Sequence, residues 1–465
     1  MRVSRRDFSK RLCAAGGSLL LSRDARSQTT HDPRLLPLQP VEADVNQRSV
    51  YGVSEWFAYY GDYGLGIDEG KLNSVVEECI DVQRNTGIDH LVWNCGRSTI
   101  DYHSELPNTT RMCEHAEAVG GKSWSFVARV MERYCPLRRA ITHCRTLGLP
   151  LLGRLGMNRH YGTPEYSAVT SQFSLKNPQF RERCKDGSQS KGKLCYAFPE
   201  VQQERLDILL EIQRLGVDGL VLDYCRQMPI LQYHDTLVTP YVKQSGVDPR
   251  QIDSDNPDDY RQWFQYRADI LTGFMRKLRG EVRRQEKLLG RSCPITARVP
   301  DSAPWLMIAW GLDVEQWLAD DLVDATMLSP FPRCCEDSKL YPEYHIALAH
   351  KHGKPCIGGV GARELIRGDS FENTGFSHPK PIYKIAARQY KAGADVMSLY
   401  QTETLARMAY LHETMRAIGN RSLVIQRAAE LPDPDHKLDP RIALDWHTRL
   451  GHGESLRSSA GAYAL

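Results

Sequence analysis

Two aspartates stand directly after short apolar runs in this 465-residue chain. Asp223 closes the run GLVLD, and Asp301 follows the run ITARVP. In parallel α/β folds the carboxyl ends of the strands face the reactive site, so a polar residue there is placed for chemistry. Asp223 has a structural alternative as a helix N-cap or as an ion-pair partner of Arg226. We favour the functional role, because Asp218 and Gly219 already supply the turn at the other end of this run.

The elements that would position these acids alternate along the chain. Short apolar runs rich in β-branched and aromatic residues are separated by helical patterns, which is typical of a parallel sheet. The predicted strands lie near residues 49–56, 88–95, 149–156, 219–223, 294–299, 322–328, 354–360 and 394–400. Four predicted helices end in a glycine shortly before the next strand, as a helix C-cap favours. These glycines are Gly87, Gly148, Gly216 and Gly393.

Eight such strands predict an α/β fold of the (β/α)8 TIM-barrel type over residues 49–420, as a single catalytic domain. A doubly wound sheet is the alternative. The segments after the third and fourth strands, about 157–198 and 224–257, are long, polar and aromatic, which is typical of the β3α3 and β4α4 loops of an active-site face. We interpret residues 28–48 as a linker and residues 421–465 as a C-terminal extension with little core.

A likeness to a known family rests on five segments. They are YAFPEVQQERLDILLEI, GVDGLVLDYCRQMP, ARVPDS, GLDVEQWLADDLVD and GADVMSLYQ. Over roughly residues 50–418 the chain resembles the (β/α)8 proteins labelled glycosyl-hydrolase-like family 10. The resemblance implies a barrel that acts on carbohydrate, without naming the sugar.

Cleavage of a glycosidic bond requires two carboxyl groups, one that donates a proton and one that acts as nucleophile or base. We assign Asp223 as the nucleophile or electrostatic stabiliser, because neighbouring Arg226 should keep it ionised. The acid should be a carboxyl group kept protonated by apolar neighbours. Asp301, with proline and tryptophan nearby, is the first choice. Glu55 and Glu364 are the reserves.

Side chains near the predicted strand ends are candidates for contact with sugar. The polar candidates are Asn94, Arg97, Arg154, Asn158, His160, Arg226 and Arg298. Arg298 could hold the carboxylate of an acidic sugar or orient Asp223, and the alternative places Arg154 and Arg298 in a structural salt-bridge layer inside the barrel. The aromatic candidates for stacking on a pyranose are Trp56, Trp93, Tyr224 and Tyr400, each of which could instead be a core residue.

Other functions stay open. A non-catalytic carbohydrate-binding barrel would keep the groove but lack a competent acid. A metal-dependent polysaccharide deacetylase could use His160, His234 and Asp235, but the chain has no H-E-x-x-H, and we expect no metal and no cofactor. The glycines of residues 358–363 leave a phosphosugar isomerase or aldolase open, although no lysine ends a predicted strand. The absence of G-x-S-x-G argues against a serine esterase.

The N-terminus has the features of an export signal. Residues 4–10, SRRDFSK, resemble the twin-arginine translocation signal, with Ser9 where leucine is usual. The apolar run that follows is far shorter than the roughly 20 residues that span a bilayer. We expect the twin-arginine translocase to export the chain. Cleavage near Gln28, after residues 1–27, should then leave a periplasmic or extracellular protein without a stable membrane anchor. An uncleaved anchor and a disordered basic N-terminus are the alternatives.

Charge and cysteine placement narrow the class of protein further. The formal net charge of +3 becomes −2 without residues 1–27, and no long basic run interleaved with aromatics remains, so we expect no nucleic-acid partner. Cys79, Cys95, Cys225 and Cys356 fall inside apolar segments, as buried free thiols do. The adjacent cysteines at 334–335 are the best candidates for disulfide or redox chemistry, and without a C-x-x-C pair a zinc ribbon is disfavoured.

Overall fold

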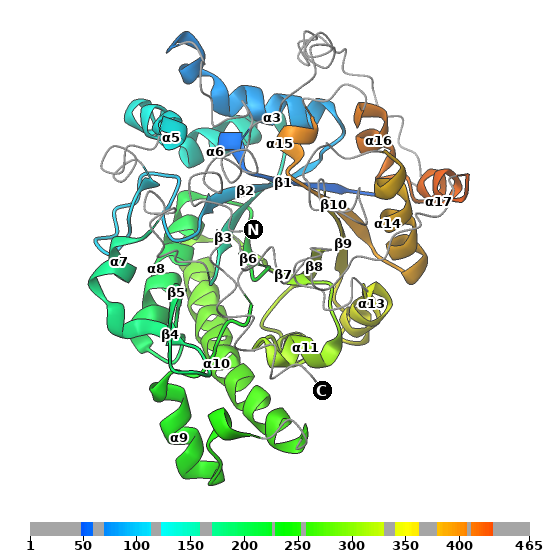
Figure 1. The fold of residues 1–465 in the computed structure, drawn as a ribbon. Coiled ribbons are helices and arrows are strands. Elements are labelled where there is room, and N and C mark those ends of the chain that lie inside the picture. The colour runs from blue at the N-terminus through cyan, green and yellow to red at the C-terminus, as the bar shows by residue number, and fades with distance from the viewer. Residues whose placement is uncertain are drawn as a thin grey trace, which may run out of the picture.

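The chain folds around a closed parallel β-barrel in a computed structural model. The structure describes residues 48–58, 69–112, 122–158, 170–225, 228–252, 257–329, 340–361, 379–406 and 411–430. Within these residues, eight strands close in the order β1-β10-β9-β8-β7-β6-β3-β2 (Figure 1). They are β1 (Val50–Ser54), β2 (His90–Gly96), β3 (Leu151–Gly156), β6 (Gly219–Asp223), β7 (Ile295–Pro300), β8 (Ala325–Ser329), β9 (Cys356–Val360) and β10 (Val396–Tyr400). The prediction of a (β/α)8 barrel is confirmed.

The barrel strands coincide with the predicted apolar runs, and the fourth run is β6 itself. All five residues of β6 are buried, because a parallel strand is covered on both faces. The largest difference is at β8, which begins three residues later than the predicted start at 322. Leu322 and Val323 are buried in the connection before β8. They are apolar because they are buried, although they do not belong to the strand.

Helices surround the barrel (Figure 1). The longer ones are α3 (Val75–Asn85), α5 (Lys122–Arg133), α6 (Pro136–Leu147), α8 (Pro199–Leu215), α9 (Asp235–Ser245), α10 (Pro257–Leu289), α13 (Pro342–Lys351) and α14 (Pro379–Ala392). Helix α8 starts with proline at its first position and ends at Gly216, whose φ of 109° favours glycine. One face of α3, which includes Val75, Val76 and Cys79, is fully buried.

The connection from β3 to β6 contains a two-stranded antiparallel hairpin. It consists of β4 (Arg181–Arg183) and β5 (Gln189–Leu194), preceded by α7 (Gln172–Lys176). Lys193 of the hairpin donates from Nζ to the carbonyl oxygen of Pro229 at 3.0 Å, in the segment that follows β6. The two long loops expected at the catalytic face therefore contact each other at the end of the barrel where β6 finishes.

Part of the expected C-terminal extension belongs to the barrel domain. Helix α17 (Arg421–Ala429) lies against α14 (Figure 1), and Val424 is fully buried. One buried residue is enough to dock this helix and agrees with an extension that has little core. Residues 431–465, and residues 1–47 with the expected signal and most of the linker, lie outside the described residues. No helix in the described part of the chain is long and apolar enough to cross a membrane.

Candidate active site

The carboxylate of Asp223 lies between two arginines at the carboxyl end of β6. Its Oδ1 accepts hydrogen bonds from Nη1 of Arg298 at 2.9 Å and from the backbone N–H of Cys225 at 3.1 Å. Its Oδ2 accepts from Nη1 of Arg154 at 3.0 Å. The side chain of Asp223 is 6% exposed. Two guanidinium charges at hydrogen-bond distance favour the ionised form of this carboxyl group.

The strand register explains why these three residues meet. Asp223 of β6 is paired with Arg298 of β7. A Cβ atom on Gly153 would meet Ile212 of α8 at 2.5 Å, so this position of β3 faces the helices. Because side chains alternate along a strand, Arg154 points into the barrel toward Asp223.

Arg154 also joins Asp223 to a second acid. Its Nη2 donates to Oε1 of Glu55 at 3.1 Å and to Oδ1 of Asn94 at 3.0 Å. Glu55 directly follows β1 and also forms an ion pair with Arg97. One guanidinium therefore connects two carboxylates, from the ends of β1 and β6.

Tyr400, the last residue of β10, completes this group. Its hydroxyl donates to Oε1 of Glu55 at 3.1 Å, and the guanidinium carbon of Arg298 lies 4.9 Å from its ring centroid. Burial alone would lower the pKa of Arg298, but the charge of Asp223 raises it above its ordinary value. We term the set formed by these side chains the mouth cluster. Its members are Glu55, Asn94, Arg97, Arg154, Asp223, Arg298 and Tyr400.

Asp301 is fully buried just beyond β7. Its Oδ1 accepts from the backbone N–H of Tyr341 at 2.7 Å, and its own N–H donates to the carbonyl oxygen of Ser329 at 3.1 Å. Burial raises the pKa of Asp301 to about 7, although the hydrogen bond from Tyr341 opposes the shift. A carboxyl group that keeps its proton up to about pH 7 suits a general acid. Its role as the acid stays a prediction.

The sequence analysis missed a further buried acid, Asp101. It is 1% exposed, and its Oδ2 accepts a hydrogen bond from Nδ2 of Asn94. Burial raises the pKa of Asp101 to about 7; the charge of Arg97 opposes this shift and that of Glu55 adds to it. The only sequence signal is Gly96, where φ is 137° and a Cβ would meet the carbonyl oxygen of Thr99 at 2.5 Å. This glycine lets the chain turn back so that Asp101 reaches the end of β2.

The arginine expected to hold Asp223 ionised was Arg226, which lies outside the described residues together with His160 and Glu364. Among the described residues, two arginines from the neighbouring strands bind Asp223, and the expected contact of Arg226 stays a prediction. Arg154 and Arg298 thus form the buried salt-bridge layer that was one of the two alternatives, and Arg298 orients Asp223 within it. Asn158 is buried two residues after β3.

Three of the four expected sugar-stacking aromatics lie in the core. The hydroxyl of Tyr224 is 3.3 Å from Sδ of Met275, and its ring lies 5.4 Å from that of Trp317. Trp56 stacks on Trp93 with ring centroids 6.2 Å apart. Tyr224, Trp56 and Trp93 are all fully buried, so the expected contacts of Tyr224 and Trp56 with sugar are corrected to packing roles. Tyr400 alone among the four expected aromatics contacts the mouth cluster.

The residues considered for a metal have structural partners. His234 is the N-cap of α9, where Nδ1 accepts from the backbone N–H of Thr236 at 3.1 Å. Asp235 pairs with Arg250. Among the described residues, no group of three or more histidine, cysteine, aspartate or glutamate side chains could hold a metal ion. The nine cysteines in these segments are free thiols, and all but Cys135 are buried. Residues 334–335 lie outside them.

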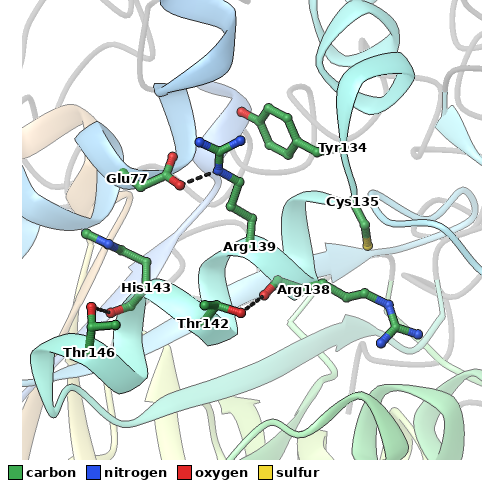
Figure 2. A pocket seen from close by; sticks show the side chains of 8 residues that line it. All are labelled: Glu77, Tyr134, Cys135, Arg138, Arg139, Thr142, His143 and Thr146. Carbon is green, nitrogen blue, oxygen red and sulfur yellow. Dashed lines mark hydrogen bonds and ion pairs between the residues drawn. The ribbon is translucent and has the colours of Figure 1, made fainter.

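A cavity of about 440 Å³ lies elsewhere, in the outer helical layer (Figure 2). It is lined by side chains of α3, α6 and the segment before α6, and none of these residues follows a barrel strand. Glu77 and Arg139 pair with each other across it, while Thr142 and Thr146 donate their hydroxyls to carbonyl oxygens of α6 itself. Because this cavity lies away from the carboxyl ends of the barrel strands, we place the candidate active site at the mouth cluster.

The fold and this cluster define a (β/α)8-barrel protein with buried acids and arginines at the carboxyl ends of its strands. No family model and no curated protein sequence matches the chain. Solved structures with a similar fold are glycoside hydrolases. A cell-surface chitinase from Paenibacillus is 11% identical over 81% of this chain, with a TM-score of 0.42. A maltogenic α-amylase from Thermotoga neapolitana is 10% identical over 82% of this chain and 76% of its own, with a TM-score of 0.41.

Chitinase B from Arthrobacter covers 87% of this chain and all of its own catalytic domain, at 10% identity and a TM-score of 0.40. The match to the Paenibacillus chitinase spans 43% of that protein's length. At such identities the likeness concerns the barrel fold and says nothing about substrate.

Proposed function

We propose that the chain is a glycoside hydrolase that cleaves a poly- or oligosaccharide outside the cytoplasm by a two-carboxylate mechanism. The observation that carries the proposal is the position of Asp223, an oriented carboxylate at the end of a barrel strand, between Arg154 and Arg298. An ionised carboxylate of this kind suits the nucleophile or the group that stabilises an oxocarbenium-like transition state.

Asp301 is the proposed proton donor. It follows the neighbouring strand β7, and burial keeps its carboxyl group protonated up to about pH 7. Glu55 is the reserve, although Arg97, Arg154 and the Tyr400 hydroxyl all favour its ionised form. The environments of the two acids therefore give them different roles: the arginines keep Asp223 ionised, and burial keeps Asp301 neutral.

The decisive experiment is the substitution Asp223→Asn, assayed by release of reducing sugar from a panel that includes chitin oligosaccharides, starch and xylan. We expect a loss of activity of about 10³-fold or more with substrate binding retained. Asp218→Asn is the matched control, because Asp218 lies just before the same strand and accepts from the N–H of Leu151 at 2.8 Å. The control should lower stability and leave turnover per folded molecule unchanged.

A carbohydrate-binding barrel without catalysis is the second candidate. The near-complete burial of Asp223 and its satisfaction by two arginines favour it, because such a carboxylate can serve structure alone. Binding to the panel without turnover by the wild-type chain would replace the hydrolase with this second function.

Export is proposed on the N-terminal sequence alone. Replacing Arg5 and Arg6 by lysine should retain the full-length chain in the cytoplasm, whereas the wild type should appear outside it with a shorter N-terminus. Fractionation with N-terminal sequencing measures both outcomes, and equal export of the two chains would contradict the twin-arginine route.

A further inference from the structure

Asp101 is a buried carboxyl group that the proposed mechanism does not use. Its Oδ2 accepts from Asn94, while its Oδ1 is buried without a hydrogen-bond partner among the described residues. A buried carboxylate oxygen without a partner is costly, whereas a neutral carboxyl group loses less on leaving water. The surroundings of Asp101 therefore favour its neutral form.

Asn94 connects Asp101 to the mouth cluster. Its Nδ2 donates to Asp101, and its Oδ1 accepts from Nη2 of Arg154 at 3.0 Å. An amide presents a donor on one side and an acceptor on the other, so the acceptor on Asp101 determines which side faces Arg154. Arg154 has its remaining contacts with Asp223 and Glu55. A change at Asp101 is thereby passed to both carboxylates.

Charged and titratable groups from three strands face Asp101. Arg97 and Arg154 would stabilise its anion, and Glu55 opposes it. Cys95 on β2 is the remaining neighbour, and burial and then the charge of Asp101 raise the pKa of its thiol. Burial outweighs the arginines and places the pKa of Asp101 at about 7. The group therefore changes charge near neutral pH, beside arginines that already bind Glu55.

We propose that Asp101 is a positioning residue whose protonation state sets the geometry of the mouth cluster. As a neutral acid it holds Asn94 against Arg154, so that Arg154 bridges Glu55 and Asp223. As a carboxylate it attracts Arg97 and Arg154 and weakens their contacts with Glu55. The effect on catalysis rests on the proposed function, whereas proton binding by Asp101 does not.

The first test needs no substrate. Urea unfolding of the full chain between pH 5 and pH 7.5 reports the number of protons that folding takes up. Asp101→Asn, which imitates the neutral acid, should lower this number by about one. Asp301→Asn is the matched control, because it removes a separate proton and should leave the contribution of Asp101 in place. Asp101→Ser keeps a neutral acceptor and serves the same comparison if the asparagine variant does not fold.

The second test uses the pH profile of kcat/KM on the member of the polysaccharide panel that is cleaved. The wild type should lose activity above about pH 7 as Asp301 and Asp101 both lose their protons, and Asp101→Asn should make this limb less steep, with a slope of log kcat/KM against pH of about −1 instead of about −2. Asp101→Ala should lose about tenfold at every pH, because Asn94 then lacks its acceptor.

The outcomes separate the two proposals. Absence of turnover on every substrate contradicts the hydrolase, while the urea experiment still decides the protonation of Asp101. A proton count in Asp101→Asn equal to that of the wild type overturns the inference. An alkaline limb as steep in an active Asp101→Asn variant as in the wild type overturns its role in positioning the cluster.

Discussion

The guanidinium of Arg154 donates to Asp223 at 3.0 Å while it holds Glu55 at 3.1 Å. One planar group therefore binds both the proposed nucleophile, Asp223, and the reserve acid, Glu55. Arg154 is 1% exposed on its side chain, so water cannot replace it. Both the candidate chemistry and the stability of the barrel mouth depend on this residue.

Arg154→Met should therefore destabilise the fold strongly. It leaves Asp223 with one arginine and weakens the pairing of Glu55, and breaking a buried ion pair costs about 3 to 5 kcal/mol. Urea unfolding at pH 7 measures the change. Arg283→Met is the control, since Arg283 pairs with Asp321 at the surface, where such a pair contributes less than about 1 kcal/mol. Equal losses in the two variants would contradict the burial argument.

The titration of Asp301 predicts a stability that falls as pH rises. Its pKa of about 7 in the folded chain exceeds the ordinary value of about 3.9, so the folded state keeps a proton that the unfolded state has released. Between about pH 4 and pH 7 this group lowers the free energy of unfolding by about 1.4 kcal/mol per pH unit. Asp301→Asn should lower the measured slope by this amount and leave the part that Asp101 contributes, as measured by urea unfolding at several pH values.

Asp248→Asn provides the control for that slope. The hydrogen bond from Arg250 lowers the pKa of Asp248, so its contribution is complete above the ordinary aspartate pKa and is lost only at lower pH. Its substitution should leave the slope between pH 5 and pH 7 unchanged. A wild-type slope that persists in Asp301→Asn would show that Asp301 is ionised across this range.

Gly153→Ala tests the packing that turns Arg154 inward. The new Cβ would lie 2.5 Å from Cγ2 of Ile212, and overpacking of this kind costs about 1 to 3 kcal/mol. Gly280→Ala in α10 is the matched control, because nothing lies within 4 Å of its new Cβ. The control should be neutral or stabilising by about 0.5 to 1 kcal/mol, since alanine favours a helix. Thermal unfolding of the two variants checks the opposite signs.

An aromatic side chain that is exposed to solvent can contact substrate, whereas a fully buried one cannot. Trp305, in helix α11 (Pro304–Ala309) four residues after Asp301, is 41% exposed, whereas Tyr224 is fully buried. Under the proposed function, Trp305→Ala should raise KM about tenfold, as loss of a stacking contact does. Tyr224→Phe should leave KM within about twofold, because it removes only a hydroxyl that faces Met275. Steady-state kinetics on oligosaccharides measures both, and the reverse pattern would restore Tyr224 as the sugar contact.

The strands and the position of Asp223 were accessible from sequence because both depend on local pattern. A strand buried on both faces is continuously apolar, so the acid that ends it stands out. The partners of Asp223 were not accessible in this way. Arg226, three residues away in sequence, lies outside the described residues, and the two described arginines that bind the carboxylate are 69 and 75 residues away. The type of side chain indicates that an arginine can bind an acid, but strand register is needed to identify which arginine does.

The sequence by itself determined the barrel, through alternating apolar runs, helix periodicity and glycines that end helices. It also determined which acids end strands. The tertiary structure decided burial and pairing, and these set the chemistry of each acid. Trp56 and Tyr224 became core residues, Arg154 and Arg298 became the partners of Asp223, and Asp101 joined the site through Asn94. Closure of the barrel brings distant strand ends together, so the protonation and pairing of each acid depend on neighbours that no local pattern contains.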